Sequence, residues 1–443
     1  MRWYFWLALL IPLTLLLWIF ICLAGVLPQS TTEQWAALAV LKQHGPDPND
    51  DSNAYPSLWL IQYDIPLSER RGITQKDVER ANGLVSSEES LKNLRPSVAA
   101  NLTAESVTTA DLEILCSRKE SSCLAKIRKA PEAVRKIIDS HAGLLQRTRE
   151  LARFSQIRDP LPKSFESPLP STGSAELVLS NAAMQFIDGD TRAGFSEVCE
   201  FANTWRRLRA HTDMLISDLI GISRVTESAR VFSQMLNEVP SNYILPETCA
   251  STFTPLLDDE FDQCDEMRNE FKSIETVFSD EHDSFGSHPP KVSAPVIERL
   301  MMNREHARLI ATVHYARLCN MEHKRKVSAR APEPPFSPPH CSYAEWPFDM
   351  VGCYLVENSF DYSDYYTRIL DLDANLRGVS TALWLRQQTG DRKTAFSARP
   401  ETLRDQHHEM ELTPDGMSIR VLHLATKGTY VGWWEIPLPP TKK

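Results

Sequence analysis

Two short clusters of histidine and acidic residues contain the groups that metal binding or acid–base catalysis would use. Glu281-His282-Asp283 with His288 forms the first, and His407-His408-Glu409 forms the second. A zinc or acid–base site needs two or more such groups to converge. Neither cluster has the H-E-x-x-H or H-x3-H spacing that puts two ligands on one face of a helix. We therefore assign no metal and no catalytic residue, and His282 and His288 stand as the candidates for a metal site.

Two further segments match a binding loop only in part. Gly189 and Gly194 have the spacing of a phosphate-binding loop, but Phe195 stands where that loop needs its lysine. A turn between two helices would account for both glycines. The run Asp371-Leu-Asp373-Ala-Asn375 opens like a calcium loop, but Leu376 stands where the loop requires glycine. We interpret this run as a helix surface, and no cofactor is predicted.

Aromatic residues offer a candidate recognition surface. Tyr362 and Tyr365 accompany the acidic stretch Asp361 to Asp364, and Trp433 and Trp434 lie near the end of the chain. Aromatic side chains dominate the anchors of binding surfaces. We take these four aromatic residues as the candidate surface, with packing of the two tryptophans in a core as the alternative.

Eight cysteines follow the first 27 residues: Cys116, Cys123, Cys199, Cys249, Cys264, Cys319, Cys341 and Cys353. Three sets are close in sequence, namely Cys116 with Cys123, Cys249 with Cys264, and Cys341 with Cys353, which leaves Cys199 and Cys319. An even number favours disulfides in an oxidising compartment, although sequence does not select the pairing. Eight reduced thiols are the alternative, and no C-x2-C pair indicates zinc.

The elements that position these residues begin with an apolar run from Trp3 to Leu27 that contains no charge. As a helix it would be about 37 Å long, which exceeds a bilayer core of about 30 Å. The run is too long for the core of a cleaved signal peptide. Arg2 precedes it, and no Lys or Arg follows until Lys42. We therefore predict a single-pass anchor over 1–28, with the amino terminus in the cytoplasm and the main domain in the periplasm.

Composition limits the class of protein. The chain has 443 residues, 42% of them hydrophobic, and a formal net charge of −10. This length and hydrophobic content suit a sizeable core. The charges are interspersed, and binding to a nucleic-acid backbone would need a concentrated basic surface. We predict no nucleic-acid partner.

Hydrophobic periodicity predicts a mainly α-helical protein. A first helical region covers 29–158, with a capping box at Ser30 to Glu33 and an extended stretch over 54–66. In 173–330, a break at Asp188-Gly189-Asp190 separates two amphipathic helices, and a third runs from Leu215 to Leu236. Consecutive amphipathic helices with short turns are typical of an antiparallel bundle or a stack similar to tetratricopeptide repeats. Two more helices are expected near 257–279 and 295–324, the second ending in the basic run His323 to Lys326.

A small α+β unit is predicted over 341–443. The segment Ala331 to His340 contains five prolines and should form a stiff linker before it. A helix is expected over 362–388. Three alternating segments follow, over 409–412, 418–424 and 430–436, with Pro414-Asp415-Gly416 as a turn between the first two. We expect a hairpin or a three-stranded sheet packed on one helix.

The anchor, the stretch Asn53 to Leu60, the Cys116 and Cys123 pair and the helical middle together resemble uncharacterised single-pass envelope proteins of Gram-negative bacteria. The resemblance implies a periplasmic setting and no assigned activity. The leading hypothesis is a non-catalytic interaction or assembly module of the cell envelope with a protein partner. The alternatives are an envelope enzyme, such as a hydrolase, without a local motif, and a protein that senses a ligand or binds a toxin.

Overall fold

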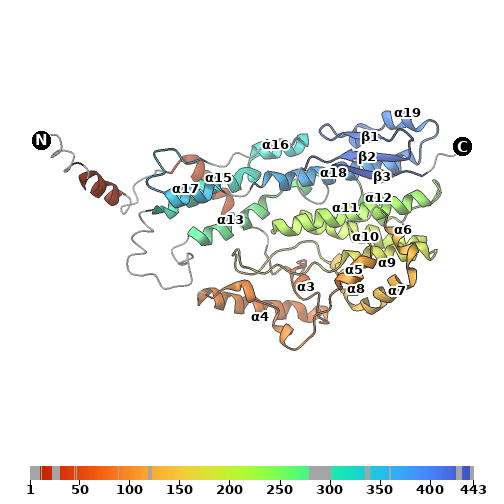
Figure 1. Cartoon of the computed structure of the whole chain (residues 1–443), viewed down its shortest axis with the longest axis horizontal. Helices are drawn as coiled ribbons and strands as arrows, with labels where there is room; N and C mark the ends of the chain where they lie inside the picture. Colours follow the sequence, from red (N-terminus) through yellow and green to blue (C-terminus); the bar gives the residue numbers. More distant parts are fainter. Residues whose placement is uncertain are drawn as a thin grey trace.

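The computed structural model is mainly helical, with a small antiparallel sheet near the carboxyl terminus (Figure 1). It describes residues 10, 12–21, 30–43, 45, 47–87, 89–117, 122–278, 301–334, 340–358, 361–425 and 432–439. The helical class and the small terminal sheet, both predicted from periodicity, are confirmed.

Of the predicted anchor, the structure describes residue 10 and residues 12–21. Residues 12–21 are helical. Six large apolar side chains of this part are exposed, namely Leu10, Leu13, Leu15, Leu16, Leu17 and Phe20. Trp18, Ile19 and Ile21 are half-buried. The rest of the predicted anchor lies outside the described residues. Within the described residues, no helix combines the length and the apolar character needed to cross a membrane.

The first helical region is built from short pieces: α2 (Thr32–Leu41), α3 (Tyr55–Trp59), α4 (Leu67–Ser86), η1 (Leu91–Asn93), η2 (Ser97–Ala100), α5 (Thr109–Ile114), α6 (Cys123–Lys129), α7 (Pro131–Ser140), α8 (Ala142–Arg149) and η3 (Glu150–Arg153). The capping box of α2 uses Thr31 and Gln34, one residue later than expected. The expectation of an extended segment over 54–66 is wrong, because α3 occupies its start. Tyr55, Leu58 and Trp59 are all buried, so this segment has no exposed face to set a period.

The middle of the chain forms the predicted run of three helices, α9 (Ala175–Ile187), α10 (Thr191–Ala210) and α11 (Leu215–Glu238), each packed against the other two. Gly189 in the first turn has φ 95°, a left-handed conformation that suits glycine. Gly194 lies inside α10, so the expectation that the turn accounts for both glycines is wrong. A Cβ at Gly194 would lie 2.7 Å from the Ala182 carbonyl oxygen, which shows that α9 and α10 cross closely there.

The next elements are α12 (Thr248–Thr252), η4 (Asp258–Phe261), α13 (Cys264–Phe278), α15 (Arg304–Ala316), η5 (Arg317–Cys319) and α16 (Met321–Ala329). The basic run His323 to Lys326 therefore lies in the middle of the short helix α16, not at the end of a long helix as expected. Glu333 explains its placement, because its carboxylate accepts hydrogen bonds from His323 Nδ1 at 2.8 Å and from Lys326 Nζ at 2.9 Å. These contacts hold the start of the proline-rich segment against α16.

The final part contains α17 (Met350–Glu357), α18 (Ser363–Leu385), α19 (Arg392–Ser397), η6 (Glu401–Leu403) and the strands β1 (Met410–Leu412), β2 (Ser418–Leu422) and β3 (Trp433–Pro437). The strand order is β1-β2-β3, antiparallel throughout, with Glu411 opposite Arg420 and Val421 opposite Trp434. Gly416 in the turn between the first two strands has φ 68°. The sheet packs on α18 and also on α11, so two helices cover it rather than the one expected.

Buried apolar residues form two clusters. The large core joins α3, α6, α9, α10, α11, α18 and the sheet, from Ala54 to Leu438. The small core joins α2, α13, α15 and α17 with Leu215 at the start of α11. In Figure 1 the small core lies toward the amino-terminal helix and the sheet toward the opposite end. Both cores cross the predicted boundaries at 158, 173, 330 and 341, and a division into domains there stays a prediction.

Candidate functional site

A cavity of about 380 Å³ lies between α11 and α18, next to the end of β2. Its apolar wall includes Leu219 and Ile220 from α11 and Leu372 from α18. Asp371 and Asn375, one helical turn apart on α18, supply polar groups to the same cavity. A site of this size, with mostly apolar walls and a few polar groups, has the make-up of a small-molecule or peptide pocket.

Asp371 connects the cavity to His408, a residue that precedes β1. His408 Nε2 donates to Asp371 Oδ1 at 2.9 Å. The backbone amide of Leu424 also donates to Oδ1, at 2.7 Å, and that of Ala425 donates to Oδ2, at 3.1 Å. Both oxygens of this carboxylate are therefore occupied, and it fixes the chain after β2 to α18.

Asp405 holds the other side of the His408 ring, with its Oδ1 3.1 Å from Nδ1. The burial of His408 alone would lower its pKa, but hydrogen bonds and charge from Asp371 and Asp405 raise it to about 9. Burial would likewise raise the pKa of Asp405, but His408 lowers it to about 2. At neutral pH the group is an imidazolium between two carboxylates.

A second histidine, His423, borders the cavity directly after β2. His423 Nε2 lies 2.9 Å from Asn375 Oδ1. On the facing helix α11, Arg224 lies 3.6 Å from Glu176 and 3.3 Å from Glu227. Ser223, also on the cavity wall, donates its hydroxyl to Glu227 Oε1 at 2.8 Å. The polar groups around the cavity are thus paired with one another.

His408 and Ser223 are not arranged as a general base and a serine nucleophile. A general base must accept a proton near the working pH, whereas His408 is held protonated by two carboxylates. A serine nucleophile needs an adjacent base that is itself oriented by a third group, whereas the Ser223 hydroxyl is directed to a carboxylate on its own helix. The cavity offers shape and apolar surface together with hydrogen-bonding groups.

The predicted metal candidates His282 and His288 lie outside the described residues. Within the part of the chain that is described, no group of three His, Cys, Asp or Glu side chains has an arrangement that could hold a metal ion. The second histidine cluster is divided, because His407 is exposed while His408 is buried against Asp371. The partial calcium motif and this cluster, weighed separately in the sequence, therefore meet in one network.

The four aromatic residues of the candidate recognition surface are not brought together. Tyr362 is buried in the small core, where its ring centroid lies 5.8 Å from that of Tyr365. Trp434 is buried in the large core, which agrees with the packing alternative, and Trp433 is exposed on β3. A recognition role for Trp433 stays a prediction.

All eight cysteines that follow the predicted anchor are paired. The disulfides are Cys116–Cys123, Cys199–Cys249, Cys264–Cys319 and Cys341–Cys353. Two of the three sets that are close in sequence, Cys116 with Cys123 and Cys341 with Cys353, form disulfides. Cys249 and Cys264 do not bond to each other, because helix packing brings Cys249 in α12 against Cys199 in α10.

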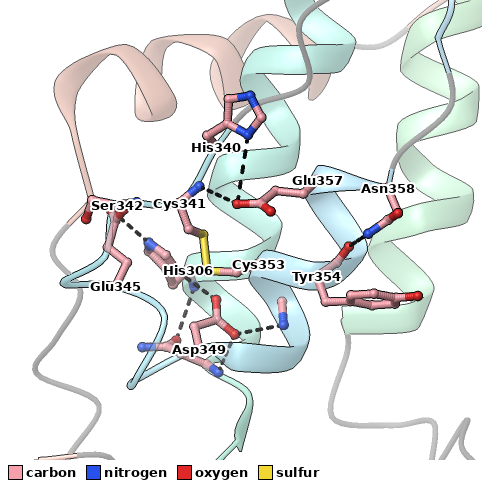
Figure 2. Close-up of a disulfide and its surroundings, with 12 residues drawn as sticks. His306, His340, Cys341, Ser342, Glu345, Asp349, Cys353, Tyr354, Glu357 and Asn358 are labelled. Atoms are coloured by element: carbon pink, nitrogen blue, oxygen red, sulfur yellow. Dashed lines mark hydrogen bonds and ion pairs between the residues drawn. A yellow bond between two sulfur atoms is a disulfide. The ribbon is translucent and has the colours of Figure 1, made fainter.

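Figure 2 shows the Cys341–Cys353 disulfide and a buried histidine beside it. His306 Nδ1 lies 2.7 Å from Asp349 Oδ2, and Asp349 Oδ1 accepts from the backbone amides of Asn303 and Gly352. His306 Nε2 lies 3.5 Å from Glu345. Asp349 is fully buried and caps α17, so this pair holds the loop closed by the disulfide onto α15.

No protein family model, no curated protein and no solved structure matches this chain.

Proposed function

We propose that this chain is a membrane-anchored, non-catalytic interaction module of the cell envelope, with its helical part in the periplasm and the α11–α18 cavity as its binding site. The observation that carries the non-catalytic part is the closed network around Asp371. Asp371, His408 and Asp405 hydrogen-bond to one another and to backbone amides. Their oxygen and nitrogen atoms therefore hold the site in shape and are not free to react with a substrate.

The compartment rests on the cysteines. The four disulfides account for every cysteine after the apolar run. Disulfides persist in oxidising compartments and are rare in the cytosol. Exposed leucines around the described amino-terminal helix support an apolar surrounding for that helix. The bundle or repeat-like stacking of α9, α10 and α11 supplies the rigid frame behind the cavity.

Reporter fusions test the topology. A phosphatase that folds only outside the cytoplasm, fused after Lys443, should be active, and a cytoplasmic reporter at the same position should be inactive. The reverse pattern contradicts the proposed orientation.

In-cell crosslinking of the tagged full-length chain tests the interaction, with residues 1–28 alone as control. An envelope protein captured by the full chain and absent from the control supports the proposal. Ile216→Trp at the rim of the cavity should reduce this capture, whereas Ile244→Trp, on an exposed loop after α11, should leave it unchanged. Capture of nothing beyond the control contradicts the proposal.

Sensing of a small ligand is the second candidate, and the size of the cavity favours it. A screen of metabolites against the purified chain should then find compounds that raise the thermal midpoint by binding the folded state. The same compounds should have no effect on Ile216→Trp and keep their effect on Ile244→Trp. An unchanged shift in Ile216→Trp would place the ligand elsewhere.

A further inference from the structure

Two hydrogen-bonding groups at the α11–α18 cavity differ from the paired groups described above. Asn375 on α18 and Thr226 on α11 both line the cavity, although the two residues are only 1% and 2% exposed. Within the described part of the chain, no hydrogen bond is made by Asn375 Nδ2 or by the Thr226 hydroxyl. Buried polar groups without partners are rare in folded proteins, because each one costs free energy.

Asn375 presents a hydrogen-bond donor to the cavity. Its Oδ1 lies 2.9 Å from His423 Nε2. A carbonyl oxygen can only accept, so the histidine nitrogen donates this bond and the two hydrogens on Asn375 Nδ2 remain for a ligand. The Thr226 hydroxyl can donate or accept.

The packing of the two helices brings these groups to the same level of the cavity. Helices α11 and α18 lie side by side (Figure 1), and both begin at the small core. Just after α18, Arg386 Nη1 donates to the Leu236 carbonyl near the end of α11 at 2.6 Å, across 150 positions of sequence. The helices therefore run in the same direction with an offset of about 150 residues, since each rises by the same distance per residue. Thr226 and Asn375 match this offset.

The charged side chains that line the cavity have partners of their own. Glu176 Oε1 lies 3.6 Å from Arg224 Nη1, and Arg368 Nη2 lies 2.7 Å from Asp364 Oδ2. The Asp371 carboxylate is occupied as described above. A charged ligand would have to break one of these pairs or lose its water without gaining a partner, and both are costly. The cavity therefore favours an uncharged ligand.

From these observations we propose that the cavity takes an uncharged ligand that combines an apolar body with an amide group. The amide oxygen accepts from Asn375 Nδ2, and the amide N–H donates to Thr226 Oγ1. The apolar body lies against Leu219, Ile220 and Leu372. This inference rests on the cavity being the binding site, as proposed above.

Ligand-observed NMR with the purified full-length chain in lipid nanodiscs tests the ligand class. The probes are N-acetyl-leucinamide, N-acetyl-leucine and leucinamide. They share one apolar side chain and are neutral, negative and positive, respectively, at about pH 6. N-acetyl-leucinamide should bind at least about tenfold more tightly than either charged probe, because a charged probe must leave water beside charges that are already paired.

Thr226→Val tests the proposed contact, since valine has nearly the shape of threonine and lacks the hydroxyl. The change breaks no hydrogen bond within the described residues, so the thermal midpoint should stay the same or rise. N-acetyl-leucinamide should nevertheless bind at least about fivefold more weakly, because its N–H loses its acceptor.

The matched control is Thr381→Val, also a buried threonine of this helix pair. Thr381 is fully buried in α18, donates to the Arg377 carbonyl at 2.7 Å and is not part of the cavity wall. This variant should keep the wild-type affinity for N-acetyl-leucinamide.

Three results would overturn the inference. Equal or tighter binding of a charged probe would show that the paired charges do not exclude charge. Binding of none of the probes would show that the cavity does not take a neutral amide. Equal binding to Thr226→Val and to the wild type would show that water, and not a ligand, satisfies this hydroxyl. Loss of in-cell capture in Ile216→Trp would still support the cavity as the binding site, so the two proposals fail separately.

The in-cell crosslinking of Thr226→Val identifies the source of the amide. A fall in capture that accompanies the loss of probe binding would assign the amide to a segment of the protein partner. Unchanged capture with lost probe binding would assign it to a free small molecule.

Discussion

At the scale of single residues, ionic pairs inside the protein are more informative than its surface charges. The Asp405–His408–Asp371 network joins α18 to the segments on either side of the first two strands, and the buried pair Arg209–Asp218 joins α10 to α11. Each group gains its stabilising effect only while its partner keeps the opposite charge. Both networks therefore give testable consequences for stability.

Stability should fall as the pH rises from 6.5 to 9, because folding raises the pKa of His408 from 6.5 to about 9. The contribution of this group is complete below its unfolded pKa and is lost as the pH passes its folded pKa, roughly 3 kcal/mol in all. His408→Gln should be less stable at pH 6 and should lose most of this decline. Thermal unfolding of the full chain at pH 6 and pH 9 measures both effects.

His407→Gln is the matched control, because the neighbouring histidine is exposed. It should retain the wild-type stability and its pH dependence. An equal decline in His408→Gln and the wild type would refute a charged His408 in the folded state.

Asp218→Asn should destabilise the protein by about 3–5 kcal/mol, the usual cost of leaving one member of a buried ion pair alone. Asp218 is fully buried, and Arg209 Nε donates to its Oδ1 at 2.7 Å while Gln263 Nε2 donates to Oδ2 at 3.0 Å. Urea unfolding measures the change. Glu238→Gln, which removes the half-exposed pair with Arg128, should cost less than about 1 kcal/mol.

At the scale of elements, the surroundings of two glycines indicate that replacement by alanine has opposite effects on stability at the two positions. Gly194→Ala in α10 should destabilise the protein, because a Cβ would lie 2.7 Å from the Ala182 carbonyl oxygen of α9. Gly83→Ala in α4 should stabilise it by up to about 1 kcal/mol, because a Cβ there meets nothing within 4 Å and alanine favours helix. Thermal unfolding of both variants should shift the midpoint in opposite directions, and equal shifts would contradict the close crossing.

The sequence predicts elements well where one face is buried and the other is not. Helix α10 and strand β3 have such faces, and their periods are visible. Helix α3 is buried on every side, so its residues follow no period. The network at the cavity could not be predicted in this way, because Asp371 and His408 are 37 residues apart and meet only after the sheet has packed on α18.

The same limit applies to the cysteines. The two short disulfide loops join cysteines that are neighbours in sequence, since each lies within one local unit. Cys199 and Cys249 are 50 residues apart, and their pairing depends on how α12 packs against α10. In the sequence, only the apolar face of the helix that becomes α10 indicated that Cys199 would be buried, because Cys199 lies there with Val198 and Ala202.

At the scale of the whole molecule, the carboxyl-terminal part completes the large core. Helix α18 and the sheet contribute Tyr366, Ile369, Val421 and Ile436 to it. A chain that ends at Pro334 should therefore lose cooperative thermal unfolding and become sensitive to protease. A chain that ends at Pro439 should behave like the full protein. A sharp transition in the shorter chain would establish the predicted linker as a domain boundary.

The disulfides should differ in their contributions to stability. In the chain-entropy treatment, a bond that closes 50 residues stabilises by roughly 4 kcal/mol and one that closes seven by roughly 2.5 kcal/mol. Cys199→Ala with Cys249→Ala should thus lower the free energy of unfolding more than Cys116→Ala with Cys123→Ala. Denaturant unfolding of the two double variants provides the comparison, and the opposite ranking would contradict the loop-length argument.

The order of the disulfides has a consequence for how the protein is made. Along the chain, each cysteine after the apolar run bonds to the next: 116 to 123, 199 to 249, 264 to 319 and 341 to 353. A polypeptide threaded through a translocation channel with its amino-terminal part leading presents its thiols in the order in which they bond. If the domain is exported as proposed, an oxidase that joins successive thiols as they emerge would make every native bond, with no isomerase needed to rearrange wrong pairs.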